Sequence, residues 1–357
     1  MKIIQVMPEF ELGGAEIMVE TLSYELKKLG CDVIVVSLFN LHTPITDRME
    51  QNGIRVEFFD KKSGLDLSQV RKLYKFFKKE KPDVVHTHRN AIQYGALAAC
   101  FARVTCKIHT LHSIAEKENG KIQRKFNKIL FKYFGVVPVS LSKLIQDSVI
   151  DEYGVKAKNT PIILNGMPLE KYNKKTDYEI YGGVKVIHVG RFVEPKNHYG
   201  LIKAFKAICK SYPDATLNLF GVGELMEDIK AYVKEEGLEK NVVFNGVSHN
   251  IENELIKNDI FCFPSIYEGV PLALIEAMAS AMPIVATNVG GISNMLENEI
   301  DAFVTDNNTK TISDSIIKLI ASKELRETMG ANAYNRAKDF SSLNMAKRYM
   351  YLYEAKD

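Results

Sequence analysis

Residues 2–38 read KIIQVMPEFELGGAEIMVETLSYELKKLGCDVIVVSL, and this stretch decides the fold. Lys2–Met7 and Asp32–Leu38 are short runs rich in apolar and β-branched residues, which predicts two buried strands. Between them, Ala15–Leu29 has the pattern of a helix, and Gly30 ends it. A strand, a helix and a second strand in so short a stretch predict a β-α-β unit, the building block of a parallel sheet.

The same alternation continues along the chain and predicts two doubly wound α/β domains. Continuous apolar runs separated by helices are typical of parallel sheets covered on both faces. Only Asn165–Gly183 lacks a clean periodicity, which indicates an interdomain linker. We therefore expect domains at residues 1–164 and 184–340, a linker at 165–183, and a C-terminal helix at 341–357 that packs back on the first domain. Further strands are predicted at Arg55–Phe59, Asp83–His86, Thr105–Thr110, Val136–Val139, Val184–Val189, Ala215–Phe220, Asn241–Asn245, Asp259–Phe263, Pro283–Thr287 and Ala302–Val304.

Length and composition narrow the function classes. A chain of 357 residues with 46% hydrophobic and 25% charged residues has the composition of an ordinary globular protein of two domains. The net charge of +3 is too small to indicate nucleic acid as the main partner. The five cysteines are scattered, which predicts reduced thiols in the cytoplasm. No apolar run approaches the roughly 20 residues that span a bilayer, and MKIIQVMPEF lacks the apolar core of a signal peptide.

Two glycine-containing loops follow predicted strands, where doubly wound sheets bind their ligands. Gly13–Glu16, which reads GGAE, opens the first helix, so its backbone N–H groups can approach an anion. A tight turn is the alternative interpretation. Gly190–Asn197 carries Arg191 and Lys196 just ahead of a helix, an arrangement that suits a diphosphate. Here the alternative is a pair of solvated surface cations.

The most informative segment is 268–279, which reads EGVPLALIEAMA. Pro271 favours the first helical position, which puts Glu268 on the preceding loop and Glu276 in the second turn. A carboxylate in so apolar a helix is rarely buried without a partner, and ribose or sugar hydroxyls are suitable partners. The alternative is a structural glutamate paired with an arginine or a lysine.

Four histidines, His86, His88, His109 and His112, lie at or after two predicted strand ends. Their spacing raises the possibility of zinc, but nothing completes a ligand shell and the chain has no Asp-x-Asp pair, so we expect no metal site. Packing residues are one alternative for these side chains. A contact with a sugar hydroxyl or with the acceptor is the other.

Taken together, these residues resemble the retaining glycosyltransferases of family 4, which have the GT-B fold of two Rossmann-like domains facing a central cleft. The resemblance covers nearly the whole chain. It rests on Gly13–Glu16, on His112, on Gly190–Lys196, and above all on the Glu-x7-Glu spacing of Glu268 and Glu276. Two departures from the family pattern are Pro271, where many members have glycine, and Asn294, where glutamate is usual. The first removes a possible N–H donor to phosphate, and the second puts the role of that glutamate in doubt.

The resemblance implies a role for each candidate residue. Glu276 bonds the nucleotide ribose, Glu268 bonds hydroxyls of the donor sugar, and His112 joins the catalytic set. Arg191 and Lys196 hold the diphosphate, which is also approached from the other domain. The remaining implied donor contacts are Gly14, Val270, Leu272, Gly246, Val247 and Ser248, the last three beside the base.

The implied activity is a retaining, metal-independent hexosyltransferase without a cofactor. It would move a sugar from a nucleoside diphosphate donor, most simply a UDP-sugar, to a glycan or a polyprenyl-diphosphate-linked acceptor. The product would serve cell-surface polysaccharide, either capsule or lipopolysaccharide. A GT-B-fold sugar-nucleotide epimerase and a non-catalytic sugar-nucleotide-binding protein stay open as alternatives. A dehydrogenase is disfavoured, because Gly221–Gly223 is followed by Met226 where a third glycine or alanine belongs.

Residues 121–134, KIQRKFNKILFKYF, predict a basic amphipathic helix. We expect a cytoplasmic protein in which this helix docks on the anionic inner face of the cell membrane. The alternative is that the apolar side packs on the sheet and the lysines are only solvated. A second basic cluster, Lys72–Lys81, surrounds Phe76 and Phe77. The apolar side of the helix is formed by Ile122, Phe126, Ile129, Leu130 and Tyr133, and its cations are Lys121, Arg124, Lys125, Lys128 and Lys132.

Overall fold

A computed structural model describes residues 1–11, 13–248, 250–268 and 271–355. The chain divides into an N-terminal unit, Met1–Pro168 with Phe340–Asp357, and a C-terminal unit, Leu169–Asp339. Segment 165–183, predicted as a linker, is therefore shared between the two units at 168/169. Each unit contains a six-stranded parallel sheet, which confirms the predicted pair of doubly wound α/β folds.

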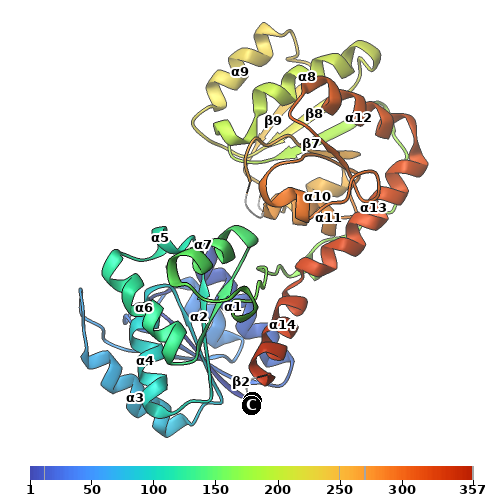
Figure 1. Cartoon of the computed structure of the whole chain (residues 1–357). Coiled ribbons are helices and arrows are strands. Elements are labelled where there is room, and N and C mark those ends of the chain that lie inside the picture. Colours follow the sequence, from blue (N-terminus) through green and yellow to red (C-terminus); the bar gives the residue numbers. More distant parts are fainter. Residues whose placement is uncertain (12, 249, 269–270, 356–357) are drawn as a thin grey trace. The chain divides into compact units, whose positions relative to one another are not determined.

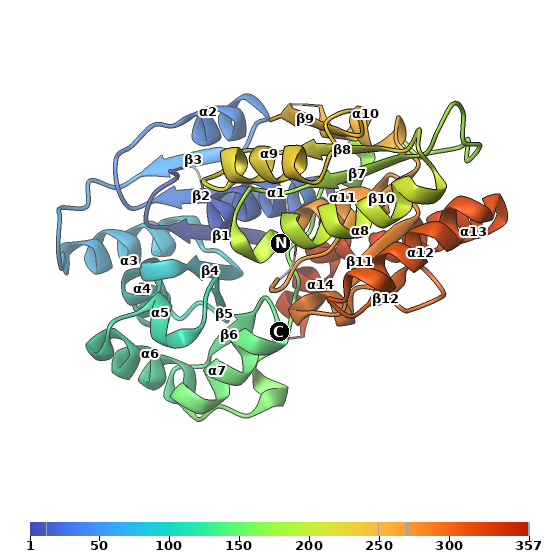
Figure 2. The same cartoon turned by 90° about the horizontal axis from the view of Figure 1, so that it is seen from above.

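The N-terminal sheet has the strand order β3-β2-β1-β4-β5-β6, which can be followed in Figure 2. The order reverses beside β1, as in other doubly wound sheets. Its strands are β1 (Lys2–Met7), β2 (Asp32–Ser37), β3 (Arg55–Phe58), β4 (Val84–His88), β5 (Cys106–Leu111) and β6 (Val136–Ser140). Its helices are α1 (Gly14–Lys28), α2 (Pro44–Gln51), α3 (Ser68–Glu80), α4 (Ile92–Ala102), α5 (Ala115–Glu118), α6 (Lys121–Tyr133), α7 (Lys143–Tyr153) and α14 (Ser342–Glu354).

The alternation of side chains along each strand supplies two separate cores. Ile3 and Val35 join the core under α1, α2 and α14, whereas their neighbours Ile4 and Val36 join the core under α3 and α4. Successive residues of a strand point to opposite faces, so a continuous apolar run covers both faces of the sheet. These two core clusters therefore depend on the short apolar runs that predicted the strands of this unit.

The last helix of the chain, α14, belongs to the N-terminal unit, although the whole C-terminal unit separates it in sequence from the rest of that unit (Figure 1). Tyr349 and Tyr353 on α14 are buried in the core with α1. Their hydroxyls bond inner residues of the sheet: Tyr353 lies 2.8 Å from His86 Nδ1, and Tyr349 lies 2.8 Å from Thr110 Oγ1. The end of the chain thus completes the first domain.

The C-terminal sheet has the order β12-β11-β10-β7-β8-β9. Helices α8, α9 and α12 cover the face that carries Val186, Leu217 and Cys262. The strands are β7 (Lys185–Val189), β8 (Thr216–Phe220), β9 (Val242–Gly246), β10 (Ile260–Phe263), β11 (Ile284–Thr287) and β12 (Phe303–Thr305). The helices are α8 (His198–Ser211), α9 (Met226–Glu235), α10 (Ile251–Ile256), α11 (Leu272–Ala279), α12 (Thr309–Ala321) and α13 (Lys323–Ala337).

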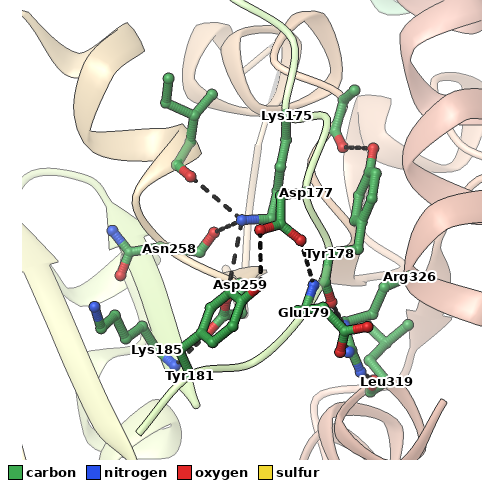
Figure 3. Close-up of polar contacts among 12 residues, drawn as sticks. Lys175, Asp177, Tyr178, Glu179, Tyr181, Lys185, Asn258, Asp259, Leu319 and Arg326 are labelled. Carbon is green, nitrogen blue, oxygen red and sulfur yellow. Dashed lines mark hydrogen bonds and ion pairs between the residues drawn. The ribbon is translucent and has the colours of Figure 1, made fainter. Parts of the chain in front are cut away.

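Residues 172–183 cross the C-terminal unit as an irregular segment held by polar contacts (Figure 3). Lys175 Nζ donates to the carbonyl of Asn258 at 2.8 Å and lies 3.8 Å from the Asp259 carboxylate. Arg326 donates two hydrogen bonds, of 3.0 and 2.7 Å, to the carbonyl of Tyr178. These buried charges satisfy carbonyl groups that have no sheet partner, so the segment has a defined course without regular secondary structure.

Candidate active site

The loops that leave β7, β8 and β9 are joined to one another by backbone hydrogen bonds. Gly190 donates to the carbonyl of Phe220 at 2.9 Å, and Gly221 donates to the carbonyl of Gly246 at 2.7 Å. Gly221 has φ +135°, and a Cβ there would lie 2.0 Å from the Gly190 oxygen, so this position requires glycine. The carboxyl edge of the sheet therefore carries a closely packed glycine platform, the place where such sheets bind ligands.

The loop between β7 and α8 holds Lys196 against the loop after β10. Asn197 adopts the left-handed conformation with φ 54°, and its side chain caps α8 by accepting from the Gly200 N–H at 3.2 Å. The same side chain donates to the carbonyl of Pro264 at 3.0 Å, and Ile266 N–H donates to the carbonyl of Pro195 at 2.8 Å. Two loops that are distant in sequence are thus brought together beside Lys196.

Lys196 and Glu268 form an ion pair, with side chains that are 19% and 11% exposed. The Lys196 ammonium also lies 4.8 Å from the centre of the Phe263 ring, within the range of a cation–π contact. Arg191 follows β7 on the same loop and is exposed, and the structure records no side-chain partner for it among the described residues. The site thus presents one held cation, one unpaired cation and one carboxylate.

Glu276 lies in the second turn of α11 and accepts a hydrogen bond of 2.9 Å from the Tyr172 hydroxyl. The helix begins at Leu272, and Pro271 precedes it as the N-cap, with an extended backbone. The prediction that Pro271 occupies the first helical position was therefore wrong by one residue. Burial raises the pKa of Glu276, the Tyr172 hydrogen bond lowers it, and the charge of Glu252 raises it. The partner is a tyrosine, not the arginine or lysine of the structural alternative.

The loop after β11 supports the backbone of Glu268. Gly291 N–H donates to the Glu268 carbonyl at 3.3 Å, and a Cβ on Gly290, which has φ +52°, would lie 2.0 Å from the same oxygen. A glycine is therefore required at position 290 if Glu268 is to stay in place. Of the other expected contacts in this unit, Val270 lies outside the described residues, as does the side chain of Asn294.

The expected base contacts lie at the end of β9 and in the loop that follows it. Gly246 has φ +67° with open space beside it, Val247 is exposed, and Ser248 Oγ accepts from the Asn250 N–H at 3.2 Å. Leu272, at the start of α11, is likewise exposed. These four residues are accessible at the carboxyl side of the sheet, and their contacts do not assign them to a particular part of a ligand.

His188, at the end of β7, is a buried residue of the site that the sequence did not single out. Its Nδ1 bonds the Cys262 carbonyl at 2.9 Å, while its buried Nε2 has no partner among the described residues. A Cβ on Gly190 would lie 2.9 Å from that Nε2, so the ring lies directly under the loop of Arg191 and Lys196. Burial lowers the pKa of His188 to about 4, which keeps the ring neutral beneath two cations.

In the N-terminal unit, the first turn of α1 holds an acidic side chain. The Glu16 carboxylate is buried, accepts a 2.6 Å hydrogen bond from Arg89, and lies 2.4 Å from where a Cβ on Gly13 would be. A Cβ on Gly14 would meet no described atom within 4 Å, so nothing in this unit crowds that position. The helix N-terminus that was expected to approach a phosphate therefore has Glu16 on one side and open space at Gly14.

His112, after β5, is held by a carboxylate that sequence reasoning missed. Glu118 Oε2 accepts from the backbone N–H of His112 at 3.1 Å and of Ser113 at 3.3 Å, while its other oxygen has no partner among the described residues. Burial raises the pKa of Glu118 to about 7. His112 Nε2 is hydrogen-bonded to His88 Nδ1 at 3.1 Å, and burial lowers the pKa of His112 to about 3. The His112 ring is thus held by His88, and the backbone of His112 is held by Glu118.

The remaining histidines of the group are buried partners within the sheet. His86 bonds Tyr353 and Thr110, His88 Nε2 bonds Gln5 at 2.8 Å, and His109 Nδ1 bonds the Thr87 carbonyl at 3.0 Å. These contacts favour the packing interpretation for three of the four rings. The one grouping of three potential metal ligands among the described residues lies elsewhere, at the exposed side chains His42, Asp47 and Glu50.

The arrangement in the C-terminal unit has a defined chemical capacity. Two cations beside a glycine platform can neutralise a diphosphate, and two carboxylates on neighbouring elements can accept hydrogen bonds from hydroxyl groups. Cations held in place before reaction stabilise negative charge that develops on a leaving phosphate. The site is therefore suited to a ligand that joins a polyanion to hydroxyl-bearing rings.

Both halves of the chain match families of known proteins. Residues 172–336 match the glycosyl transferases group 1 family, and residues 12–171 match glycosyltransferase family 4. An Escherichia coli enzyme, UDP-Gal:alpha-D-GlcNAc-diphosphoundecaprenol alpha-1,3-galactosyltransferase, is 31% identical over 79% of this chain and 77% of its own length. A Staphylococcus aureus capsular polysaccharide biosynthesis glycosyltransferase, CapH, is 26% identical over 90% and 92%. The crystal structure of Anabaena HepE with UDP has a TM-score of 0.79 at 21% identity, covering 99% and 100%.

Proposed function

We propose that this chain, which belongs to the glycosyltransferases described as group 1 and family 4, uses a UDP-sugar to extend a lipid-linked saccharide. The observation that carries the donor proposal is the ion pair of Lys196 and Glu268 beside Arg191 at the carboxyl edge of the C-terminal sheet. The choice of uridine is supported by the E. coli relative, whose name specifies UDP-Gal, and by the HepE structure with UDP.

Each donor contact follows from the chemistry of its side chain. Arg191 and Lys196 bind the diphosphate, Glu268 accepts from hydroxyls of the donor sugar, and Glu276 accepts from the ribose hydroxyls. The backbone after β9 meets the base. The remaining proposed donor contacts are Gly14, Val270, Leu272, Gly246, Val247 and Ser248.

The transfer proceeds with retention and without a metal in this proposal. The bond between the sugar C1 and the β-phosphate oxygen breaks, and the acceptor hydroxyl forms a new bond to C1 on the same face. The departing phosphate takes the acceptor proton, and Arg191 and Lys196 stabilise the charge that develops on it. The held Lys196 and the exposed Arg191 thus supply the charge neutralisation that a divalent ion supplies in other phosphate sites.

The N-terminal unit receives the acceptor, with His112 as its proposed catalytic contact. His112 is oriented by His88 and by the backbone bonds of Glu118, and the lowered pKa of its ring keeps it neutral. A neutral imidazole can donate to or accept from a sugar hydroxyl. This role is supported by the position of His112 directly after β5 of a doubly wound sheet.

The exposed face of α6 supports an acceptor that is anchored in a membrane. Of the predicted apolar side, Leu130 is buried, but Ile122 is 85% exposed and Tyr133 is 78% exposed, so this side is divided between the core and solvent. A groove of about 680 Å³ adjoins the start of α6. Its apolar lining includes Leu65, Leu67, Leu97, Ile122 and Phe126. Exposed apolar residues that adjoin cations are typical of a surface that docks on anionic lipid.

The two basic clusters, on α3 and α6, differ in which side chains they expose to solvent. In the α3 cluster, Phe77 is buried and Phe76 packs edge-on against Phe59 at 5.5 Å, so the aromatic residues serve the core. On α6, Arg124 is paired with Glu152 at 2.8 Å, and Lys128 donates to the Glu152 carbonyl. Lys121 lines the groove and Lys125 is exposed on the same helix, and these are the cations that we assign to the membrane surface. Among the described residues, no helix has the length and apolar content to cross a bilayer.

One assay separates this function from its rivals. Purified protein is incubated with a panel of UDP-sugars, with and without a GlcNAc-diphosphate-polyprenol acceptor, and release of UDP is measured. We expect release that requires the acceptor and a glycosylated lipid as product. Release of UDP or a new sugar isomer without acceptor would instead support the epimerase, and binding without turnover would support the non-catalytic alternative.

A further inference from the structure

Tyr172 makes a contact that links the segment entering the C-terminal unit to α11. Its hydroxyl donates to Glu276 Oε1 at 2.9 Å, across 104 residues of sequence. It is the one side chain that hydrogen-bonds the Glu276 carboxylate among the residues that the structure describes. Both side chains are partly buried, so the bond is shielded from competition by bulk water.

The surroundings of Glu276 explain why a donor is needed there. Burial and the nearby Glu252 both disfavour the charged carboxylate by raising its pKa, and the Tyr172 hydroxyl is the group that opposes them. Burial, followed by the charge of Glu276, raises the pKa of Tyr172, so this hydroxyl keeps its proton and can donate it to the hydrogen bond at neutral pH. The hydrogen bond therefore stabilises the ionised form of Glu276.

The bond also leaves the carboxylate able to bind a ligand. A carboxylate is an acceptor with about four lone-pair sites, and Tyr172 occupies one of them on Oε1. Oε2 has no recorded partner among the described residues. The hydrogen bond from Tyr172 holds Oε1 and so restricts the rotation of the Glu276 side chain, which keeps the free oxygen in one direction.

We propose that Tyr172 is the positioning residue of Glu276, and that it directs the free carboxylate oxygen to the ribose 2′- and 3′-hydroxyls of the donor. This inference rests on the proposed function, in which Glu276 binds the ribose. It adds a residue that selects ribonucleotides over deoxyribonucleotides. Because Tyr172 acts through Glu276, it touches neither the diphosphate nor the transferred sugar.

The test compares binding of UDP and 2′-deoxy-UDP to the parent and to Tyr172→Phe by calorimetry. The substitution removes only the hydroxyl. We expect UDP to bind about tenfold more weakly, a loss of about 1.4 kcal/mol of binding free energy. The affinity for 2′-deoxy-UDP should change much less. The preference for UDP over its deoxy analogue should therefore shrink.

Tyr178→Phe is the matched control. Tyr178 lies on the same irregular segment, and its hydroxyl donates to the Ala281 carbonyl at 2.9 Å, away from the Glu276 carboxylate. The Tyr178→Phe variant should have a lower melting temperature than the parent but the same preference for UDP over 2′-deoxy-UDP. If Tyr172→Phe also leaves that preference intact, its hydroxyl is only a structural tether and the proposal is overturned.

Glu276→Gln separates failure of this inference from failure of the proposed function. If Glu276→Gln loses the preference for UDP and Tyr172→Phe keeps it, Glu276 binds ribose without help and only the positioning role is wrong. If both variants keep the parental preference, the assignment of Glu276 to the ribose is wrong, and the role of Tyr172 is rejected with it.

Discussion

The ammonium of Lys196 is ion-paired with the carboxylate of Glu268, over the ring of Phe263. The two residues have different proposed partners in the donor, the diphosphate and the sugar. Because they hold each other, a change at one alters the charge and position of the other. Binding of a diphosphate would give Lys196 a second anion and leave Glu268 free to accept from sugar hydroxyls. The pair is therefore one unit in the predictions below.

The first prediction separates the two carboxylates of the Glu-x7-Glu segment. Glu276→Gln should weaken UDP binding about tenfold, because the amide is a poorer acceptor for two hydroxyls. Glu268→Gln should lower kcat much more than it weakens UDP binding, because bare UDP has no sugar for it to contact. Calorimetry with UDP and steady-state kinetics with the UDP-sugar measure the two effects. Parental values for both variants would contradict the site assignment.

The second prediction concerns the cations. Arg191→Ala and Lys196→Ala should each lower kcat about a hundredfold or more, which raises the activation free energy by about 3 kcal/mol, because each removes a cation that stabilises the developing phosphate charge. Lys203→Ala, on the exposed surface of α8, is the matched control and should leave kcat unchanged. Turnover that survives both site substitutions would place the diphosphate elsewhere.

The same assay tests whether these cations act without a metal. Transfer should continue in excess EDTA, since the proposed charge neutralisation uses only side chains and backbone. Activity that disappears in EDTA and returns with manganese would show that the metal-free mechanism is wrong.

The third prediction concerns the surface of α6. Lys121→Glu with Lys125→Glu should reduce flotation with anionic liposomes more than tenfold, since each cation contributes about 1 kcal/mol near such a surface. Binding by the parent should also fall at high salt. Lys203→Glu with Lys210→Glu on α8 makes the same change of net charge in the other unit and should bind as the parent does. Equal flotation of all three proteins would reject this docking surface.

The fourth prediction follows from the buried histidines. Burial lowers the pKa of His109 to about 3 and of His188 to about 4, so between these values and pH 6.5 the unfolded state binds more protons. Their stabilising contribution is complete above pH 6.5 and is lost as the pH falls, by about 1 kcal/mol per pH unit for each ring. Glu118, with its pKa raised to about 7, has the opposite sign and favours the folded state at low pH.

We therefore expect the melting temperature to fall between pH 7 and pH 5. His109→Phe keeps the ring stacked on Phe131 but cannot be protonated, so its melting temperature should fall less over this range, whatever its value at pH 7. His42→Phe, at an exposed position, is the control. If the melting temperature of His109→Phe falls with pH as much as that of the parent, the His109 ring does not contribute to the pH dependence of stability.

The fold was predictable because its signals are local. Most strands are short apolar runs, and in β1 and β2 the run alternates between two cores, as Ile3 and Ile4 do. Most strand bounds differ from the prediction by one or two residues, since hydrogen-bond pairing and not composition sets where a ladder ends. The expected helix start at Pro271 was wrong because the extended backbone of this residue places it before the first turn.

Part of the candidate site was also predictable, because in a parallel sheet the loops after the strands share one edge. This rule placed Arg191, Lys196 and Glu268 on neighbouring loops. It could not show which of them touch. The pairing of Lys196 with Glu268 spans 72 residues, and it depends on how Asn197 and Ile266 join two loops.

By itself, the amino-acid sequence determined the alternation of strands and helices, the parallel sheets and the loops that carry the charged residues, because these depend on short-range periodicity. Only the tertiary structure decided the partners: Tyr172 for Glu276, Glu118 for the backbone of His112, and Tyr353 of the last helix for His86, 267 residues away. A buried polar group must be satisfied by whatever donor or acceptor the packed chain brings near it. That choice has no period in the sequence, so it is made only when the elements pack.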